Sequence, residues 1–181
     1  TFFVTSAGLG DGANLGGLAG ADSHCMKLAE AAGSTGKNWV AYLSADGINA
    51  KDRIGAGPWQ NFTGEEIATD VANLHSEANN LTKQTALTET GGVVNGRGDT
   101  PNIHDILTGS NADGTLAAGM TCGDWTLNGE GSAIVGHSDR MGPETLATGT
   151  SWNTAHPSRG CSQDNLVSTG GSGLFYCFAA N

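Results

Sequence analysis

The chain has 181 residues, of which 29 are glycine and only 14% are charged. Eighteen acidic against eight basic residues give a formal net charge of −10, which disfavours binding to nucleic acids and to anionic lipid. The glycines follow no Gly-X-Y period, so a collagen helix is excluded, and no apolar run approaches the roughly 20 residues of a membrane helix. We therefore expect a soluble, loop-rich and compact protein with no nucleic-acid partner and no membrane insertion.

The first strands and the first helix are predicted near the N-terminus. Residues 1–6 are rich in aromatic and β-branched side chains, which is typical of a strand. A helix is predicted from Asp22, which can cap its N-terminus, to about Ala32, with Gly33 as its stop signal. Residues 39–43 predict a short buried strand.

A second helix is predicted to begin near Thr63. Thr63 and Glu66 match the capping box, in which a threonine at the cap and a glutamate three residues later satisfy free backbone N–H groups. The apolar residues that follow at helical spacing are Ile67, Val71, Leu74 and Ala78.

Beyond residue 88 the chain is dense in Gly, Asn, Asp and Thr, which favours turns and short strands. The elements predicted there are strands over 103–108, 132–136 and 174–178, and a turn over 170–173. Because the helices come early and the strands cluster late, the predicted fold class is α+β. No repeat or linker interrupts the chain, so we expect one domain over residues 1–181.

The cysteines stand at wide spacings and include no C-x-x-C pair; they are Cys25, Cys122, Cys161 and Cys177. This spacing excludes zinc-ribbon and thioredoxin-type sites. An even number of cysteines in a loop-rich chain favours two disulfides and an oxidising compartment, that is, a secreted or cell-surface protein. Four reduced, buried cysteines are the alternative.

Several segments, taken in order along the chain, resemble the endostatin domain of collagen XVIII. Residues 20–25 (Gly-Ala-Asp-Ser-His-Cys) resemble its G-A-D-x-x-C, and residues 39–44 its F-x-A-F-L-S. Residues 108–114 are similar to its H-G-S-x-x-x-G and residues 122–125 (Cys-Gly-Asp-Trp) to its C-x-x-W. Residues 174–178 resemble its final strand, so the likeness extends over nearly the whole chain.

The resemblance implies a compact relative of the C-type lectin domain. It implies two nested disulfides, Cys25–Cys177 and Cys122–Cys161, and a mixed, mostly antiparallel sheet with two helices packed on it. It also favours a secreted or cell-surface adhesion domain that binds an extracellular protein or matrix component. Long Gly/Asn/Thr loops with few charges would let flat surfaces pack, so the residues also allow self-assembly as a structural subunit of an extracellular assembly. No G-x-S-x-G elbow and no phosphate-binding glycine motif occurs, so we expect no enzyme activity and assign no catalytic residue.

The metal sites of the resembling families have no clear counterpart. The N-terminal zinc segment and the arginine-rich heparin patch of endostatin are missing, and so are the E-P-N and Q-P-D calcium motifs of sugar-binding C-type lectins. Thr154 stands where the lectins' W-N-D has its carboxylate, although calcium prefers several charged oxygen ligands. We therefore expect no cofactor, with calcium or zinc as the alternatives.

Histidines and carboxylates recur in the late loops, at His104-Asp105, at 137–139 (His-Ser-Asp) and at His156. Such side chains could bind zinc if the fold gathered them. Spacing in the sequence does not determine that geometry, so we expect histidines that are exposed or satisfied by internal hydrogen bonds, and we assign no metal ligand.

A carbohydrate-binding module is the alternative function. Trp152, Asn153 and His156, together with Trp59 or Trp125, could form a platform that stacks on a sugar ring and hydrogen-bonds to it. Trp125 is expected in the core instead, because it lies beside a cysteine that the resemblance places in a disulfide.

An Arg97-Gly98-Asp99 triplet lies in a turn-prone segment. An exposed loop tip could offer Arg97 and Asp99 to an integrin-like receptor. The alternative is that Asp99 caps the turn and Arg97 forms an internal ion pair.

Overall fold

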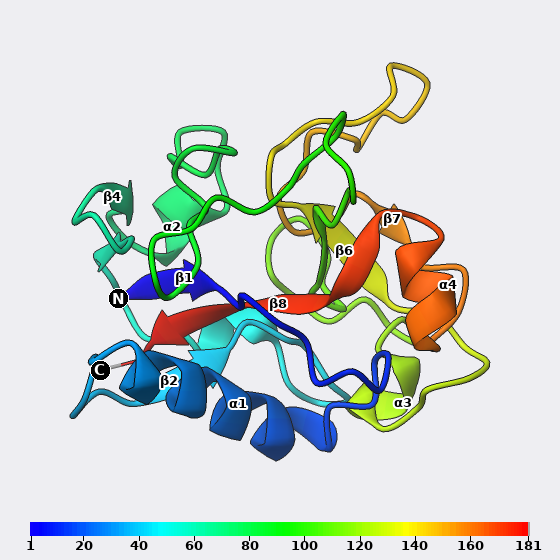
Figure 1. The fold of residues 1–181 in the computed structure, drawn as a ribbon, viewed down its shortest axis with the longest axis horizontal. Helices are drawn as coiled ribbons and strands as arrows, with labels where there is room; N and C mark the ends of the chain where they lie inside the picture. The colour runs from blue at the N-terminus through cyan, green and yellow to red at the C-terminus, as the bar shows by residue number, and fades with distance from the viewer. Residues whose placement is uncertain (181) are drawn as a thin grey trace.

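The long C-terminal strand β8 (Gly171–Ala179) is the axis of the fold in the computed structural model, which describes residues 1–180 (Figure 1). Strands β1 (Phe2–Val4) and β2 (Trp39–Ala41) pair antiparallel with its C-terminal half. Strand β5 (Asp105–Leu107) pairs in parallel with its N-terminal half. Strand β8 thus joins β1 and β2 to the β5 side of the sheet, and the strand predicted over 174–178 is confirmed.

The rest of the sheet extends from β5. Strand β6 (Ile134–His137) pairs antiparallel with β5, and the short β7 (His156–Pro157) pairs antiparallel with β6. A separate two-stranded ribbon joins β3 (Trp59–Gln60) and β4 (Glu66–Ala68). Among the described strands only the β5–β8 pair is parallel, so the predicted mixed, mostly antiparallel sheet is confirmed.

Four α-helices lie within residues 1–180: α1 (Gly17–Ala31), α2 (Val71–Leu74), α3 (Cys122–Trp125) and α4 (Gln163–Val167), with a 3-10 turn, η1 (Ala50–Asp52). The α+β class is therefore confirmed. Only α1 is a long helix, whereas the resemblance implied two helices packed on the sheet. Helices α3 and α4 are single turns that flank disulfide cysteines, and their short lengths leave little periodicity to detect in the sequence.

The first helix begins at Gly17, upstream of the predicted cap Asp22. The carboxylate of Asp22 instead accepts hydrogen bonds from the guanidinium of Arg53 at 2.7 and 2.9 Å and from the N–H of Ala41 at 2.8 Å. It therefore ties α1 to β2 rather than capping the helix. Gly33 has φ +83° just beyond the end of the helix, which confirms it as the stop signal.

The predicted helix beginning near Thr63 is wrong. The side-chain oxygen of Asn61 accepts hydrogen bonds from the N–H groups of Thr63 and Glu65, which holds a tight turn between β3 and β4. Helix α2 begins only after Asp70, whose carboxylate caps it by accepting from the N–H of Asn73 at 2.8 Å. A local capping pattern was overridden here by an asparagine-centred turn. The predicted turn over 170–173 is also wrong from residue 171 onward, because β8 starts there.

The two disulfides are nested as the endostatin resemblance implies. Cys25–Cys177 joins α1 to β8, and Cys122–Cys161 joins α3 to the segment before α4. No cysteine is free in the described part of the chain, so the alternative of four reduced thiols is wrong.

Both faces of the sheet are covered by core side chains. Along β8, Phe175 and Cys177 point into a layer shared with α1 and both disulfides, whereas Leu174, Tyr176 and Phe178 point into an aromatic layer on the other face. This alternation is the period of two that a strand imposes. In residues 1–180, no helix combines the length and the apolar character that crossing a membrane requires.

Candidate functional site

Three short strands bring residues that are far apart in the sequence to one point. Asp105 begins β5 and lies directly opposite His137, the last residue of β6. His156 begins β7 and pairs with Val135, two residues before His137 and therefore on the same face of β6. His104 directly precedes Asp105. We call His104, Asp105, His137 and His156 the histidine cluster.

The carboxylate of Asp105 lies at the centre of the histidine cluster. Its Oδ1 is 3.4 Å from the Nε2 atom of His104 and 3.4 Å from that of His137. Its Oδ2 is 3.5 Å from the Nε2 atom of His156. Three imidazole nitrogens therefore face one carboxylate.

The other ring nitrogen of each histidine contacts an oxygen acceptor. The Nδ1 atom of His104 is 2.8 Å from the carboxylate of Asp139, and that of His137 is 2.6 Å from the carbonyl oxygen of Gly149. The Nδ1 atom of His156 is 3.0 Å from the carbonyl oxygen of Pro157. Because carbonyl and carboxylate oxygens only accept hydrogen bonds, the Nδ1 atom of each ring is the donor. The interaction with the carboxylate of Asp105 raises the pKa of His156, whose protonated Nε2 points its N–H toward that carboxylate.

Asp105 is a buried anion. Its side chain is 1% exposed, and in the described chain neither of its oxygens nor the Nε2 atom of His137 has a hydrogen-bond partner. Burial acts to raise the pKa of Asp105, but the facing imidazoles of His137 and His156 outweigh it and lower the pKa to about 2. The expectation of exposed or internally satisfied histidines is therefore wrong for His137, and such unpaired buried groups are rare.

The three histidines of the cluster, with Asp105 buried behind them, line a hollow of about 320 Å³, which we call the histidine hollow. Its wall includes Asn102, Pro143, Leu146, Ser168 and Thr169 together with two arginines, Arg97 and Arg159. Both arginines are exposed, and neither guanidinium has an ion pair or hydrogen bond within residues 1–180. By contrast, Arg53 pairs with Asp22 and Arg140 with Glu77.

The predicted sugar platform is absent. Trp152 is only 4% exposed and packs between Tyr42 and Tyr176, and Asn153 is fully buried. The side-chain amide of Asn153 donates to the hydroxyl of Tyr42 at 3.0 Å and to backbone carbonyls. Trp59 and Trp125 are buried as well, so the expectation that Trp125 lies in the core is confirmed. No indole face of this group is open to a sugar ring.

Of the other predicted ligand residues, His156 is partly exposed and belongs to the histidine cluster. In the Arg97–Asp99 triplet, the carboxylate of Asp99 accepts from the N–H of Gly96 at 2.8 Å and from Lys83 Nζ at 2.5 Å. The interpretation of Asp99 as a turn cap is therefore confirmed. The internal ion pair proposed for Arg97 is not formed within residues 1–180, and Arg97 lines the histidine hollow.

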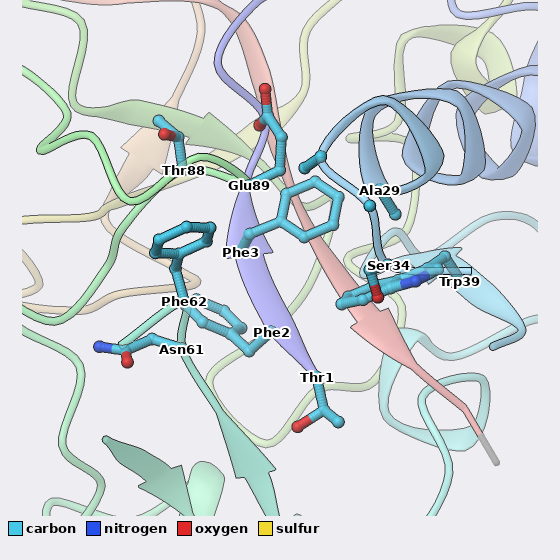
Figure 2. Close-up of a pocket in the computed structure, with 12 residues that line it drawn as sticks. Thr1, Phe2, Phe3, Ala29, Ser34, Trp39, Asn61, Phe62, Thr88 and Glu89 are labelled. Atoms are coloured by element: carbon cyan, nitrogen blue, oxygen red, sulfur yellow. The ribbon is translucent and has the colours of Figure 1, made fainter. Parts of the chain in front are cut away.

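A second hollow, of about 250 Å³, lies between β1 and the C-terminal end of α1. Figure 2 shows the rings of Phe3, Phe62 and Trp39 around it, and Phe62 is 57% exposed. The carboxylate of Glu89, which lines this hollow, accepts hydrogen bonds from the N–H and the hydroxyl of Ser6. This hollow offers a ligand mainly aromatic surface, whereas the histidine hollow offers arginine and histidine side chains. We therefore take the histidine hollow as the candidate site.

No protein-family model matches the chain, and no curated protein matches it. The candidate site therefore rests on its own geometry. A signal for it exists in the sequence, since Asp105 lies inside one predicted strand and His137 directly follows another, but which strands are neighbours is a property of the tertiary structure.

A pH-dependent contact lies beside the buried Asn153. His75 accepts a hydrogen bond from the hydroxyl of Tyr42 at its Nε2 atom, 2.7 Å away, while its Nδ1 lies 2.7 Å from the carbonyl oxygen of Val71. Burial lowers the pKa of His75 below its usual value. Protonation therefore costs more in the folded than in the unfolded chain.

We expect the free energy of unfolding to be highest above the usual histidine pKa of about 6.5 and to fall as the pH drops below it. Urea denaturation at pH 7.5 and pH 5 measures this loss. The loss between the two pH values should be smaller in His75→Gln than in the wild-type protein, because the variant lacks the titrating side chain. An equal loss in both proteins would contradict the assignment.

Proposed function

We propose that the protein is a secreted or cell-surface binding domain of the endostatin and C-type-lectin-like class, without catalysis, that recognises a carboxylate of a protein partner in the histidine hollow. The nested disulfides and the mixed α+β sheet support the scaffold, since the resemblance implies both. Disulfides are typical of oxidising compartments, which supports the location.

The observation that carries the ligand class is the pair of unpaired arginines, Arg97 and Arg159, on one hollow of a chain with a net charge of −10. Guanidinium groups match the planar, two-oxygen geometry of a carboxylate. The long-range field of the chain repels polyanions, so we expect a partner that presents one or a few acidic side chains.

The carbohydrate-binding alternative has lost the residues on which it rested, because Trp152 and Asn153 are core residues. A sugar that carries a carboxylate would still offer the same acidic group to the two arginines. A neutral sugar would offer neither charge nor a partner for stacking.

A nuclear magnetic resonance titration tests the proposal. We expect a short peptide with one glutamate to shift the backbone amide signals of residues that line the histidine hollow, and its glutamine counterpart to leave them unchanged. Arg97→Ala and Arg159→Ala should each weaken binding up to about fivefold, the upper range for an exposed ion pair. Lys27→Ala, which removes the same charge from α1, serves as the control.

Two outcomes would contradict the proposal. Binding of both peptides alike, or signal changes away from the hollow, would remove the carboxylate as the recognised group. Binding of an oligogalacturonate but of neither peptide would favour the carbohydrate-binding alternative.

A further inference from the structure

We propose that the histidine cluster holds a zinc site, in which the Nε2 atoms of His104 and His137 and the carboxylate of Asp105 are the ligands. This inference goes beyond carboxylate recognition and does not depend on it. It rests on the separations of the ligand atoms, on unpaired buried atoms, and on the partners of the outer ring nitrogens.

The separations fit a small transition-metal ion. One ligand atom each from His104, Asp105 and His137 lies within 4.8 Å of the other two. The Nε2-to-oxygen distances in the cluster are 3.4, 3.4 and 3.5 Å. Tetrahedral zinc with bonds of about 2.0–2.1 Å places its ligand atoms about 3.4 Å apart. The Nε2 atom of His156 lies 3.5 Å from the second carboxylate oxygen and outside this group of three.

The unpaired atoms indicate a missing positive charge. Because the Nδ1 atom of His137 donates to the carbonyl oxygen of Gly149, its buried Nε2 lone pair faces the carboxylate of Asp105, and neither group has a hydrogen-bond partner there. A divalent cation between His137 and Asp105 would accept both sets of lone pairs and compensate the charge of Asp105, whose burial is otherwise costly.

The outer contacts have the form that orients metal-binding histidines. A metal-bound imidazole commonly donates its other N–H to a carboxylate or a backbone carbonyl. Here His104 has Asp139 as that partner, and His137 has the carbonyl of Gly149. Asp139 is itself held by the N–H groups of Arg97 and Met141.

The donor set selects the ion. Imidazole nitrogens favour zinc and its transition-metal neighbours, whereas calcium and magnesium prefer oxygen ligands. The rings of His104 and His137 lie nearly parallel, with centroids 4.2 Å apart, so binding requires them to tilt toward each other. Three protein ligands leave the fourth position of a tetrahedral shell to water or to a carboxylate of a bound partner.

Zinc would also neutralise the local charge behind the histidine hollow. Asp105 and Asp139, both in contact with His104, together contribute −2, and Zn²⁺ would bring this sum to zero. We therefore expect zinc to strengthen carboxylate binding, a consequence that rests on the proposed function.

The test uses protein freed of metal by a chelator and then titrated with Zn²⁺ in a calorimeter. We expect one zinc per chain, a rise in Tm of about 5–10 °C at a zinc concentration about 100 times the Kd, and no response to Ca²⁺. Co²⁺ in place of zinc should give the intense visible bands of a four-coordinate site. Asp105→Asn and His137→Gln should weaken zinc binding at least about 100-fold, whereas His24→Gln, a histidine outside the cluster, should leave it unchanged.

The same variants also show whether a loss of zinc binding is caused by unfolding. The amide of Asp105→Asn can donate to a facing Nε2 lone pair, so its Tm without zinc should not fall, and zinc should no longer raise it. His156→Gln, at the exposed side of the cluster and outside the three ligands, offers a second folded variant, in which zinc binding should change less than in His137→Gln. A wild-type protein that binds no zinc, or a folded Asp105→Asn variant that binds it fully, would overturn the proposal. If the wild-type protein binds no zinc but still responds to the glutamate peptide, the zinc site is refuted and the proposed carboxylate recognition is not.

Discussion

Replacing Cys25 and Cys177 together by alanine should lower the free energy of unfolding by about 5 kcal/mol, close to the whole stability of many small domains. The bond joins residues 152 positions apart and ties α1 to the central strand β8. Without it the unfolded chain gains the conformational freedom of a very long loop, which favours unfolding. Equilibrium denaturation in urea, followed by circular dichroism, measures the difference.

The second disulfide provides the matched comparison. Cys122 and Cys161 are 39 positions apart, so the same loop-entropy argument gives a smaller loss of about 4 kcal/mol for their double replacement by alanine. Reducing agent applied to the wild-type protein should reproduce both losses together. A denaturation transition that reductant leaves unchanged would show that the bridges do not stabilise the fold.

Gly136→Ala is expected to cost more than about 4 kcal/mol or to prevent folding, which is exceptional for a single added methyl group. Gly136 lies inside β6, opposite Ile106 of β5. A Cβ atom there would lie 1.7 Å from the carbonyl oxygen of Trp152 and 2.5 Å from the Cα of Asn153. These are backbone atoms, which cannot rotate away as a flexible side chain could.

The same substitution tests how the histidine cluster is held together. Residues 152–153 pack directly on Gly136, and the chain runs from them to His156. Their close approach to β6 therefore sets the position of the His156 ring. Gly129→Ala is the control, since an added Cβ there would meet no atom of residues 1–180 within 4 Å, and its stability should change by less than about 0.5 kcal/mol. A stable Gly136→Ala protein would contradict the packing of residues 152–153 on β6.

Elements with strong local signals were predicted from the sequence. The continuous apolar and aromatic run over 174–178 predicts a strand, and β8 includes it, with both of its faces buried. Gly33 ends α1 because a residue without a Cβ adopts positive φ at little cost. The number of cysteines predicts two disulfides, and their pairing came from the resemblance to endostatin.

Elements whose signals compete with tertiary contacts were not predicted. Asp22 resembles a helix cap, but α1 begins upstream of it and its carboxylate pairs with Arg53. Thr63 resembles one as well, but the side chain of Asn61 holds its backbone in a turn. A short polar side chain can serve several local motifs, and the contacts around it decide among them.

The sequence by itself determined which chemical groups this protein carries. It is acidic and rich in glycine, and it has four cysteines and a few scattered histidines. Only the tertiary structure decided that Asp105 meets His104, His137 and His156 in one cluster and that Trp152 lies in the core. The physical reason is that strand register is set by which strands pair, and this pairing depends on contacts between segments far apart in the chain.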